Sequence, residues 1–259
     1  MKAIVPHLLF DGSWKGFLTC IYETFDRKWL GAKIFVEEDY QPSMFDDCFI
    51  VLTDNEKARR VNKGLYKKLE GTTFKSFFYA FFSESEICYQ HLLDMAVYVF
   101  SHQDYVANNF GHPAVIAVEQ FSRSVNREAH RMKAFIRFQK LSDGTYFELI
   151  NPDFNVLPLI CKHFTNRYAD QPWIIYDEKR SYGMFYNKIA IQEISFQLWE
   201  SIKGSDAIAV QPFDKEEVKF DQLWKDYYKS TNIASRKNEK LHRQHVPIRY
   251  RKYLNEFTF

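Results

Sequence analysis

The sequence is poor in glycine, proline and cysteine, and these shortages exclude several classes of protein. Nine glycines and eight prolines in 259 residues, without a low-complexity tract or an internal repeat, argue against long disordered linkers. The four cysteines form no Cys-x-x-Cys pair, so neither a zinc ribbon nor an iron–sulfur cluster is indicated. We therefore expect reduced thiols, most of them in the core.

Long hydrophobic runs are also lacking. No stretch approaches the ~18 apolar residues that a membrane-spanning helix needs. The apolar run near the first residues is short and is broken by Pro6 and His7, so it does not match a secretory signal. These features predict a cytoplasmic protein without a membrane partner.

Several enzyme motifs are absent too. The chain contains no Gly-x-Ser-x-Gly, no P-loop and no Gly-x-Gly-x-x-Gly, which argues against a serine hydrolase, a nucleotide-driven motor and a dinucleotide enzyme. Neither His130 nor His163 stands in a His-x-His or Glu-x-x-His spacing. No metal site and no cofactor is therefore predicted.

Hydrophobic and aromatic residues are abundant instead. They make up 46% and 18% of the chain, which is enough for a sizeable core. We expect an α+β fold in which antiparallel β-hairpins pack against a cluster of helices. Residues 1–213 are predicted to form the core domain, and 214–259 a basic helical extension packed on it within one structural unit.

The clearest local signal is a hairpin followed by a helix and a second hairpin. Asp143-Gly144 between aromatic and branched runs predicts a type I′ turn. Centred there, the turn pairs Phe138 with Leu149 and places Glu148 on the wet face. A helix from about 157 and a second hairpin over 173–186 follow.

The N-terminal half shows two helix signals. Ser13 is expected to cap a helix whose buried stripe includes Tyr22 and Phe25. Thr53 and Glu56 fit a capping box that starts a helix running to about Leu69. Strands are predicted over 3–10 and 47–52, separated by the first helix and an irregular acidic segment.

Charge is distributed unevenly along the chain. The net charge is only +2, yet residues 225–252 hold nine lysines or arginines against two acids, a local balance of +7. Six further cations lie between Glu56 and Glu70 with no acid among them, more than pairing along a helix would use. Such clusters favour an anionic partner, of which nucleic acid is the commonest, although a solvated basic face is the alternative.

Five strings together resemble a bacterial family assigned to DNA metabolism or DNA repair. They are FDGSWKGFLTCIYETF at 10–25, TDNEKARRVNKGLYKKL at 53–69, HRMKAFIRF at 130–138, HFTNRYADQPWIIYDEKR at 163–180 and SRKNEKLHRQHVPIRYRKYLNE at 235–256. Members of that family are encoded beside a radical SAM protein of DNA modification or repair, and a similar domain is fused to uracil-DNA-glycosylase-like proteins of the UdgX type. The resemblance implies a DNA context and a radical SAM partner, but it supplies no reaction. This chain lacks the three-cysteine radical SAM motif, so that cluster would belong to the partner.

Two sets of candidate site residues follow. His130, His163 and Asp177 are the candidate acids and bases. The candidate nucleic-acid-binding cations are Lys57, Arg60, Lys67, Arg131, Arg167, Arg180, Arg236, Arg243, Arg249 and Arg251. Tyr250 and Tyr253 interleave with the last of these, where they either stack on bases or pack against the body.

Three functions remain open on this basis. The leading hypothesis is a DNA-binding accessory in repair or modification that acts with the radical SAM protein. The second is a DNA-acting hydrolase or lyase that uses His130 or His163 with a carboxylate. The third is a scaffold that binds its protein partner without affinity for DNA. Whether the chain is an enzyme is left undecided.

Overall fold

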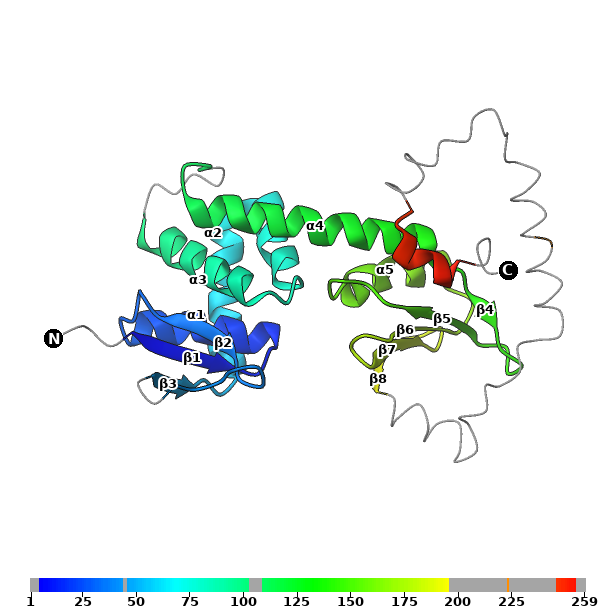
Figure 1. Cartoon of the computed structure of the whole chain (residues 1–259), viewed down its shortest axis with the longest axis horizontal. Coiled ribbons are helices and arrows are strands. Elements are labelled where there is room, and N and C mark those ends of the chain that lie inside the picture. The colour runs from blue at the N-terminus through cyan, green and yellow to red at the C-terminus, as the bar shows by residue number, and fades with distance from the viewer. Residues whose placement is uncertain (1–4, 44–45, 103–108, 196–222, 224–245, 255–259) are drawn as a thin grey trace. The chain divides into compact units, whose positions relative to one another are not determined.

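The computed structural model describes residues 5–43, 46–102, 109–195, 223 and 246–254, and the chain divides into two units, Met1–Arg127 and Glu128–Phe259 (Figure 1). The division falls within helix α4 (Pro113–Phe135). The predicted boundary at 213/214 lies outside the described residues and stays a prediction. The expected mixture of helices and antiparallel strands is confirmed. None of the helices in the described ranges combines the length and apolar character needed to cross a membrane.

The first unit contains a parallel sheet that the sequence patterns did not predict. Strands β1 (Pro6–Phe10), β2 (Lys33–Val36) and β3 (Asp47–Ile50) lie in the order β2-β1-β3, and both pairings are parallel. The strand β2 was missed because four residues are too few to show a hydrophobic period. Figure 1 shows α1 (Trp14–Asp26) and α3 (Glu86–Ser101) beside this sheet.

The starts of the first two helices are set by side-chain caps. Ser13 caps α1 as predicted, because its hydroxyl accepts a hydrogen bond from the backbone N–H of Gly16 at 2.9 Å. The predicted capping box of α2 (Asn55–Phe81) is wrong. Asp54 caps that helix, and the hydroxyl of Thr53 instead donates to a carboxylate oxygen of Asp11 at 2.7 Å.

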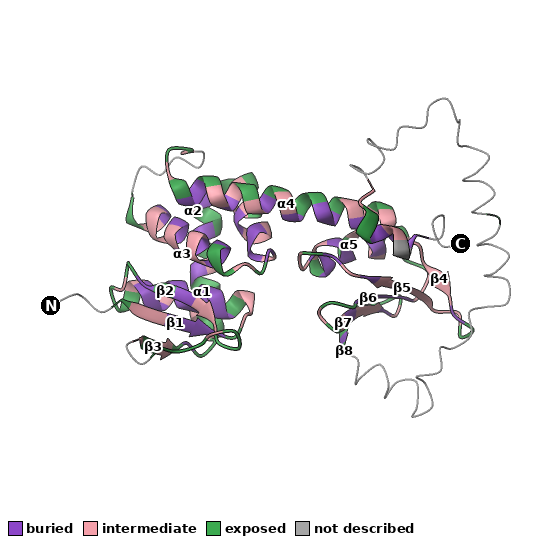
Figure 2. Ribbon diagram, in the orientation of Figure 1, coloured by how far each residue is buried: buried purple, intermediate pink, exposed green. Residues whose placement is uncertain are grey.

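Helix α2 is broken near its middle, where the sequence predicted an end. Glu70 and Gly71 have non-helical backbone angles, and the phenylalanine-rich second half follows them. This second half, α1 and the sheet pack around one hydrophobic core. The fully buried residues of that core include Phe10, Phe17 and Phe77. In Figure 2 the buried residues follow one side of the helices, as an amphipathic pattern requires.

The second unit is built on a five-stranded mixed sheet. Its strands are β4 (Gln139–Lys140), β5 (Tyr146–Ile150), β6 (Trp173–Asp177), β7 (Tyr182–Tyr186) and β8 (Ile191–Ser195), in that spatial order. The pair β5–β6 is parallel, with α5 (Leu157–Arg167) between them in sequence, and the other pairs are antiparallel. The second predicted hairpin, β6–β7, is confirmed.

The first predicted hairpin forms, but with a different turn and register. Of the two turn residues only Gly144 has a positive φ, +86°, whereas a type I′ turn needs two. Leu141 and Thr145 close a three-residue loop, which pairs Gln139 with Phe147 rather than with Glu148. The one-residue slip exchanges the two faces, so the carboxyl expected in water is buried.

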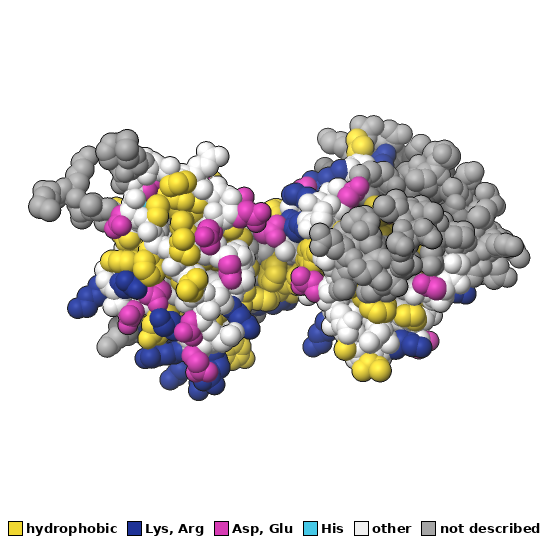
Figure 3. Space-filling view, turned by 90° about the horizontal axis from the view of Figure 1, so that it is seen from below, with side chains coloured by type: hydrophobic (Ala, Val, Ile, Leu, Met, Phe, Trp, Pro, Cys, Tyr) yellow, Lys and Arg dark blue, Asp and Glu magenta, His cyan; other side chains and the backbone are white. Residues whose placement is uncertain are grey.

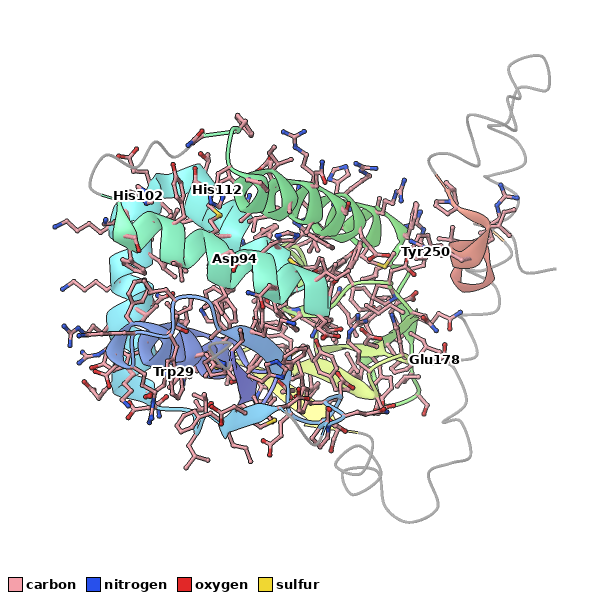
Figure 4. The ribbon with its side chains drawn as sticks, turned by 60° about the vertical axis from the view of Figure 1, so that its left-hand side comes forward. Trp29, Asp94, His102, His112, Glu178 and Tyr250 are labelled. Atoms are coloured by element: carbon pink, nitrogen blue, oxygen red, sulfur yellow. The ribbon has the colours of Figure 1, made fainter. Side chains whose placement is uncertain are left out.

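A short segment near the C-terminus belongs to the second unit. The 3-10 helix η2 (Ile248–Tyr253) inserts Tyr250, which is 2% exposed and lies 5.5 Å, between ring centroids, from Phe135 at the end of α4. Figure 4 shows Tyr250 on the side of η2 that faces the rest of this unit. Of the two interpretations of this tyrosine, the structure supports packing against the body.

Candidate functional site

A groove on the first unit lies between α1, α2 and the end of α3. It has a volume of about 650 Å³, and we call it the basic aromatic groove. It is lined by Ile21, Tyr22, Phe25, Asp26, Arg60, Val61, Lys63, Gly64, Lys67 and Phe100. Ile21 is fully buried and Val61 nearly so, and these two form its apolar floor. The volume falls within the range of ~300–1,000 Å³ typical of ligand sites.

Three half-buried aromatic rings form one wall of the basic aromatic groove. Tyr22 and Phe25 are three residues apart on α1 and therefore share a face of that helix. The ring of Phe25 meets that of Phe100 edge to face, with centroids 5.6 Å apart. Gly64 permits this arrangement, because a Cβ there would lie 3.1 Å from the ring of Phe100. Lys68 donates to two backbone carbonyls at the end of α3 and thereby fixes the segment that carries this ring.

Three exposed cations form the opposite wall. Arg60, Lys63 and Lys67 follow one another at intervals of three and four residues on α2, so they share one face over ~10 Å of helix. None of them makes an ion pair with another residue in the described ranges. Asp26 is the one acid in the lining. Figure 3 shows lysine and arginine side chains concentrated toward one edge of this unit, beside hydrophobic ones and with acids interspersed.

Lys57 lies next to the basic aromatic groove but is already paired. Its Nζ is 2.6 Å from Glu23, which is buried and also binds Arg27 at 2.8 Å. Burial acts to raise the pKa of Glu23, but the hydrogen bonds from these two cations outweigh it and lower that pKa. Lys57 also lies 5.1 Å from the centroid of the Tyr22 ring, so it supports the aromatic wall rather than offering a free charge.

Arg180, another predicted nucleic-acid contact, completes a buried turn in the second unit. Its guanidinium pairs at 2.9 Å with Asp177, which is 0% exposed, and donates to the carbonyls of Pro152 and Asp153. Burial raises the pKa of Asp177, while the charge of Arg180 acts against that rise. Asp177 also accepts hydrogen bonds from two backbone N–H groups of its own turn. The carboxylate predicted to be catalytic, that of Asp177, therefore stabilises the backbone of its own turn.

Arg249 is likewise engaged by carboxylates. It pairs with Asp153 and, at 3.2 Å, with Glu128, which is 2% exposed. Glu128 also accepts hydrogen bonds from the hydroxyl of Tyr250 and from the backbone N–H groups of Asp153 and Phe154. These contacts dock η2 onto the second unit.

The two histidines predicted as acids or bases lie on different helices of the second unit. His130 is exposed on α4, and His163 is half-buried on α5, where burial and then the charges of Lys133 and Arg167 lower its pKa. Within the described ranges, no hydrogen bond or ion pair joins either histidine to Asp177. The same ranges contain no group of three or more His, Cys, Asp or Glu side chains that could hold a metal ion.

Five of the predicted cations remain to be placed. Arg167 is exposed and lies 5.7 Å from the ring of its neighbour Tyr168. Arg131 on α4 and Arg251 on η2 are half-buried. Arg236 and Arg243 lie outside the described residues. Of the ten predicted cations, the structure therefore places Arg60 and Lys67 in the basic aromatic groove.

The aromatic wall was missed by the sequence patterns. Tyr22 and Phe25 were assigned to the core stripe of their helix, and Phe100 was not among the candidate site residues. Lys63 was counted among the cations of α2 but not singled out as a site residue. The position of Tyr22 and Phe25 near Asp26 was the available signal, because the margin of an apolar stripe is where a ring stays partly exposed.

Two units, one with helices packed on a parallel sheet and one with a mixed sheet, define a mixed α/β protein with a cation-lined aromatic groove. The chain belongs to the family of the domain of unknown function DUF4130, whose family model matches residues 50–256. The match includes α2 and α3, whereas α1 precedes it. No curated protein and no solved structure matches the chain.

Proposed function

We propose that this protein binds DNA through the basic aromatic groove, as an accessory in DNA repair or modification that acts with a radical SAM partner in the cytoplasm. The observation that carries the proposal is the wall formed by Arg60, Lys63 and Lys67, three exposed cations that the described structure leaves without carboxylate partners. Cations in this state bind phosphates with release of counterions, which supplies most of the affinity of non-specific binding to nucleic acid.

Paired cations contribute less to such binding. Lys57, Arg180 and Arg249 would have to leave buried or partly buried carboxylates to reach a phosphate. Breaking a pair of this kind leaves an uncompensated buried charge, which costs more than a surface contact returns. The proposal therefore rests on the groove and not on the number of cations in the chain.

The choice of DNA among anionic polymers comes from the resemblance to the DNA-metabolism family. The cationic wall lies within the string at 53–69, and two of the three aromatic rings, Tyr22 and Phe25, lie within the string at 10–25. The radical SAM partner and the kinship with UdgX-type fusions are part of the same proposal. A catalytic role is not part of the proposal, because no hydrogen bond or ion pair within the described residues joins His130 or His163 to Asp177.

The proposal is tested by neutralising the cationic wall. We expect Arg60→Gln with Lys67→Gln to weaken binding to a fluorescein-labelled DNA oligonucleotide, because two phosphate contacts are lost. The slope of log K against log salt should fall in magnitude by about 1.4 to 1.8. Fluorescence anisotropy over a salt series measures both quantities.

A matched control is Arg59→Gln with Arg123→Gln, which removes the same charge from two exposed arginines that pair with acids on their own helices. Equal losses in the two double variants would show a general charge effect and contradict the groove. Tighter binding to RNA of the same sequence would contradict the choice of DNA. Co-purification with the radical SAM protein by a chain that has no affinity for DNA would favour the scaffold instead.

A further inference from the structure

We infer that the basic aromatic groove takes single-stranded nucleic acid, with an unpaired base stacked on the aromatic wall and the backbone along α2. This inference rests on the proposed function and adds the strandedness and the position of the base. It follows from the two walls, which differ in chemistry. One carries the rings of Tyr22, Phe25 and Phe100, and the other carries Arg60, Lys63 and Lys67.

The aromatic wall favours single strands over duplexes, because a duplex offers no unpaired base to stack on it. The bases of a duplex are stacked on one another, so a surface that binds only duplex needs phosphate contacts and gains nothing from exposed rings. Single strands present the faces of their bases, and aromatic side chains beside a basic track are how proteins bind them. Three half-buried rings next to three unpaired cations match this second mode.

The geometry also sets the direction in which a nucleotide would lie. Neighbouring helices pack with axes about 8–10 Å apart, so a nucleotide whose phosphate binds at α2 can place its base against α1. Asp26, on the aromatic wall, disfavours a phosphate there. The side chains beneath the groove, Ile21 and Val61, are buried and apolar, so no charge lies under a bound base.

Arg60 links the two walls. Its guanidinium carbon lies 5.8 Å from the centroid of the Tyr22 ring, near the outer limit of a cation–π contact. So loose a contact allows the side chain to turn toward a phosphate while the ring receives a base. Lys57 also lies over this ring, with its Nζ 5.1 Å from the centroid, and is held by its pair with Glu23.

The inference is tested by removing bases while keeping phosphates. Three labelled ligands of equal length are compared by fluorescence anisotropy in one buffer: a thymidine oligonucleotide, the same strand with abasic sugars, and a mixed-sequence duplex. We expect the wild-type protein to bind the thymidine strand more tightly than the other two. Tyr22→Ala should weaken binding to this strand by roughly 5- to 150-fold and leave binding to the abasic strand unchanged. Tyr22→Phe, which keeps the ring, should restore the wild-type affinity.

The wild-type comparison needs no variant, so it holds even if Tyr22→Ala does not fold. Equal affinity for the thymidine and abasic strands, or preference for the duplex, would overturn the inference while the DNA-binding proposal stands. Equal losses on the thymidine and abasic strands for Tyr22→Ala would also overturn it, since the ring would then only pack. Failure to bind any of the three ligands at low salt would contradict the proposed function itself.

Discussion

At the scale of single residues, the second unit contains three buried carboxyls, those of Glu128, Glu148 and Asp177, within its described residues. Glu128 satisfies two backbone N–H groups and docks Tyr250 and Arg249. Such a group is stabilising only while every partner is present, because an unsatisfied buried donor costs ~1–3 kcal/mol. Glu148 differs, since burial is the main influence on it and its pKa is raised well above the usual value, against the opposing effect of Arg137.

Glu148 predicts a dependence of stability on pH. Because its folded-state pKa is raised, its contribution is fully present below the unfolded-state pKa of about 4.3 and is lost as pH rises through the folded-state pKa. The substitution Glu148→Gln introduces a side chain that carries no charge at any pH. We therefore expect this variant to gain stability relative to the wild type as pH increases, measured by urea unfolding at pH 4.5 and pH 8.

The control for this prediction is Glu193→Gln on β8, where the side chain is exposed. It should leave the difference between the two pH values nearly as in the wild type. If Glu148→Gln showed the same offset from the wild type at both pH values, the carboxyl would not be titrating in the folded state as its burial requires.

At the scale of elements, α1 connects the core to the candidate site. Its buried face carries Phe17 and Ile21, and its half-exposed margin carries Tyr22 and Phe25. The cap at Ser13 sets where this helix begins, and Thr19 ties it to the start of α2 through hydrogen bonds with Asp54 at 3.2 and 3.3 Å. The positions of the rings therefore depend on a side chain two to three turns away.

This dependence gives a prediction for the cap. Ser13→Ala should cost about 0.5–2 kcal/mol of stability, because the N–H of Gly16 loses its acceptor. Ser13→Thr keeps a hydroxyl and should cost much less. Thermal unfolding of both variants measures the difference, and equal midpoints for the two would mean that the hydroxyl is not the cap.

At the scale of the whole molecule, the division at Arg127 and Glu128 predicts two unfolding transitions. Each unit has its own sheet and its own buried residues, so each can unfold as a cooperative block. Phe17→Ala creates a cavity in the core of the first unit and should destabilise it by about 3–5 kcal/mol. Differential scanning calorimetry should show one transition moved and the other unchanged.

The reference variant for the second transition is Glu148→Gln at pH 8, which should move the other one. A single transition that responds to both substitutions would mean that the two units unfold together. Calorimetric and van't Hoff enthalpies that agree for the whole chain would support that alternative.

Local features of the fold were predictable because they depend on neighbours in the chain. The cap and stripe of α1, the run of cations on α2 and the hairpin β6–β7 all follow from spacings of a few residues. The break at Glu70 and Gly71 falls where the helical pattern changes. Half of the candidate site, its cationic wall, was visible for the same reason.

What the sequence by itself determined was therefore which helices form, where their charges lie and that the fold mixes helices with antiparallel strands. Only the tertiary structure decided which cations are free, because the partner of Lys57 is 34 residues away and one partner of Arg249 is 121 away. It also decided the parallel pairing of β2 and the face on which Glu148 lies. These outcomes depend on contacts between distant segments, and such contacts leave no periodic trace in the chain.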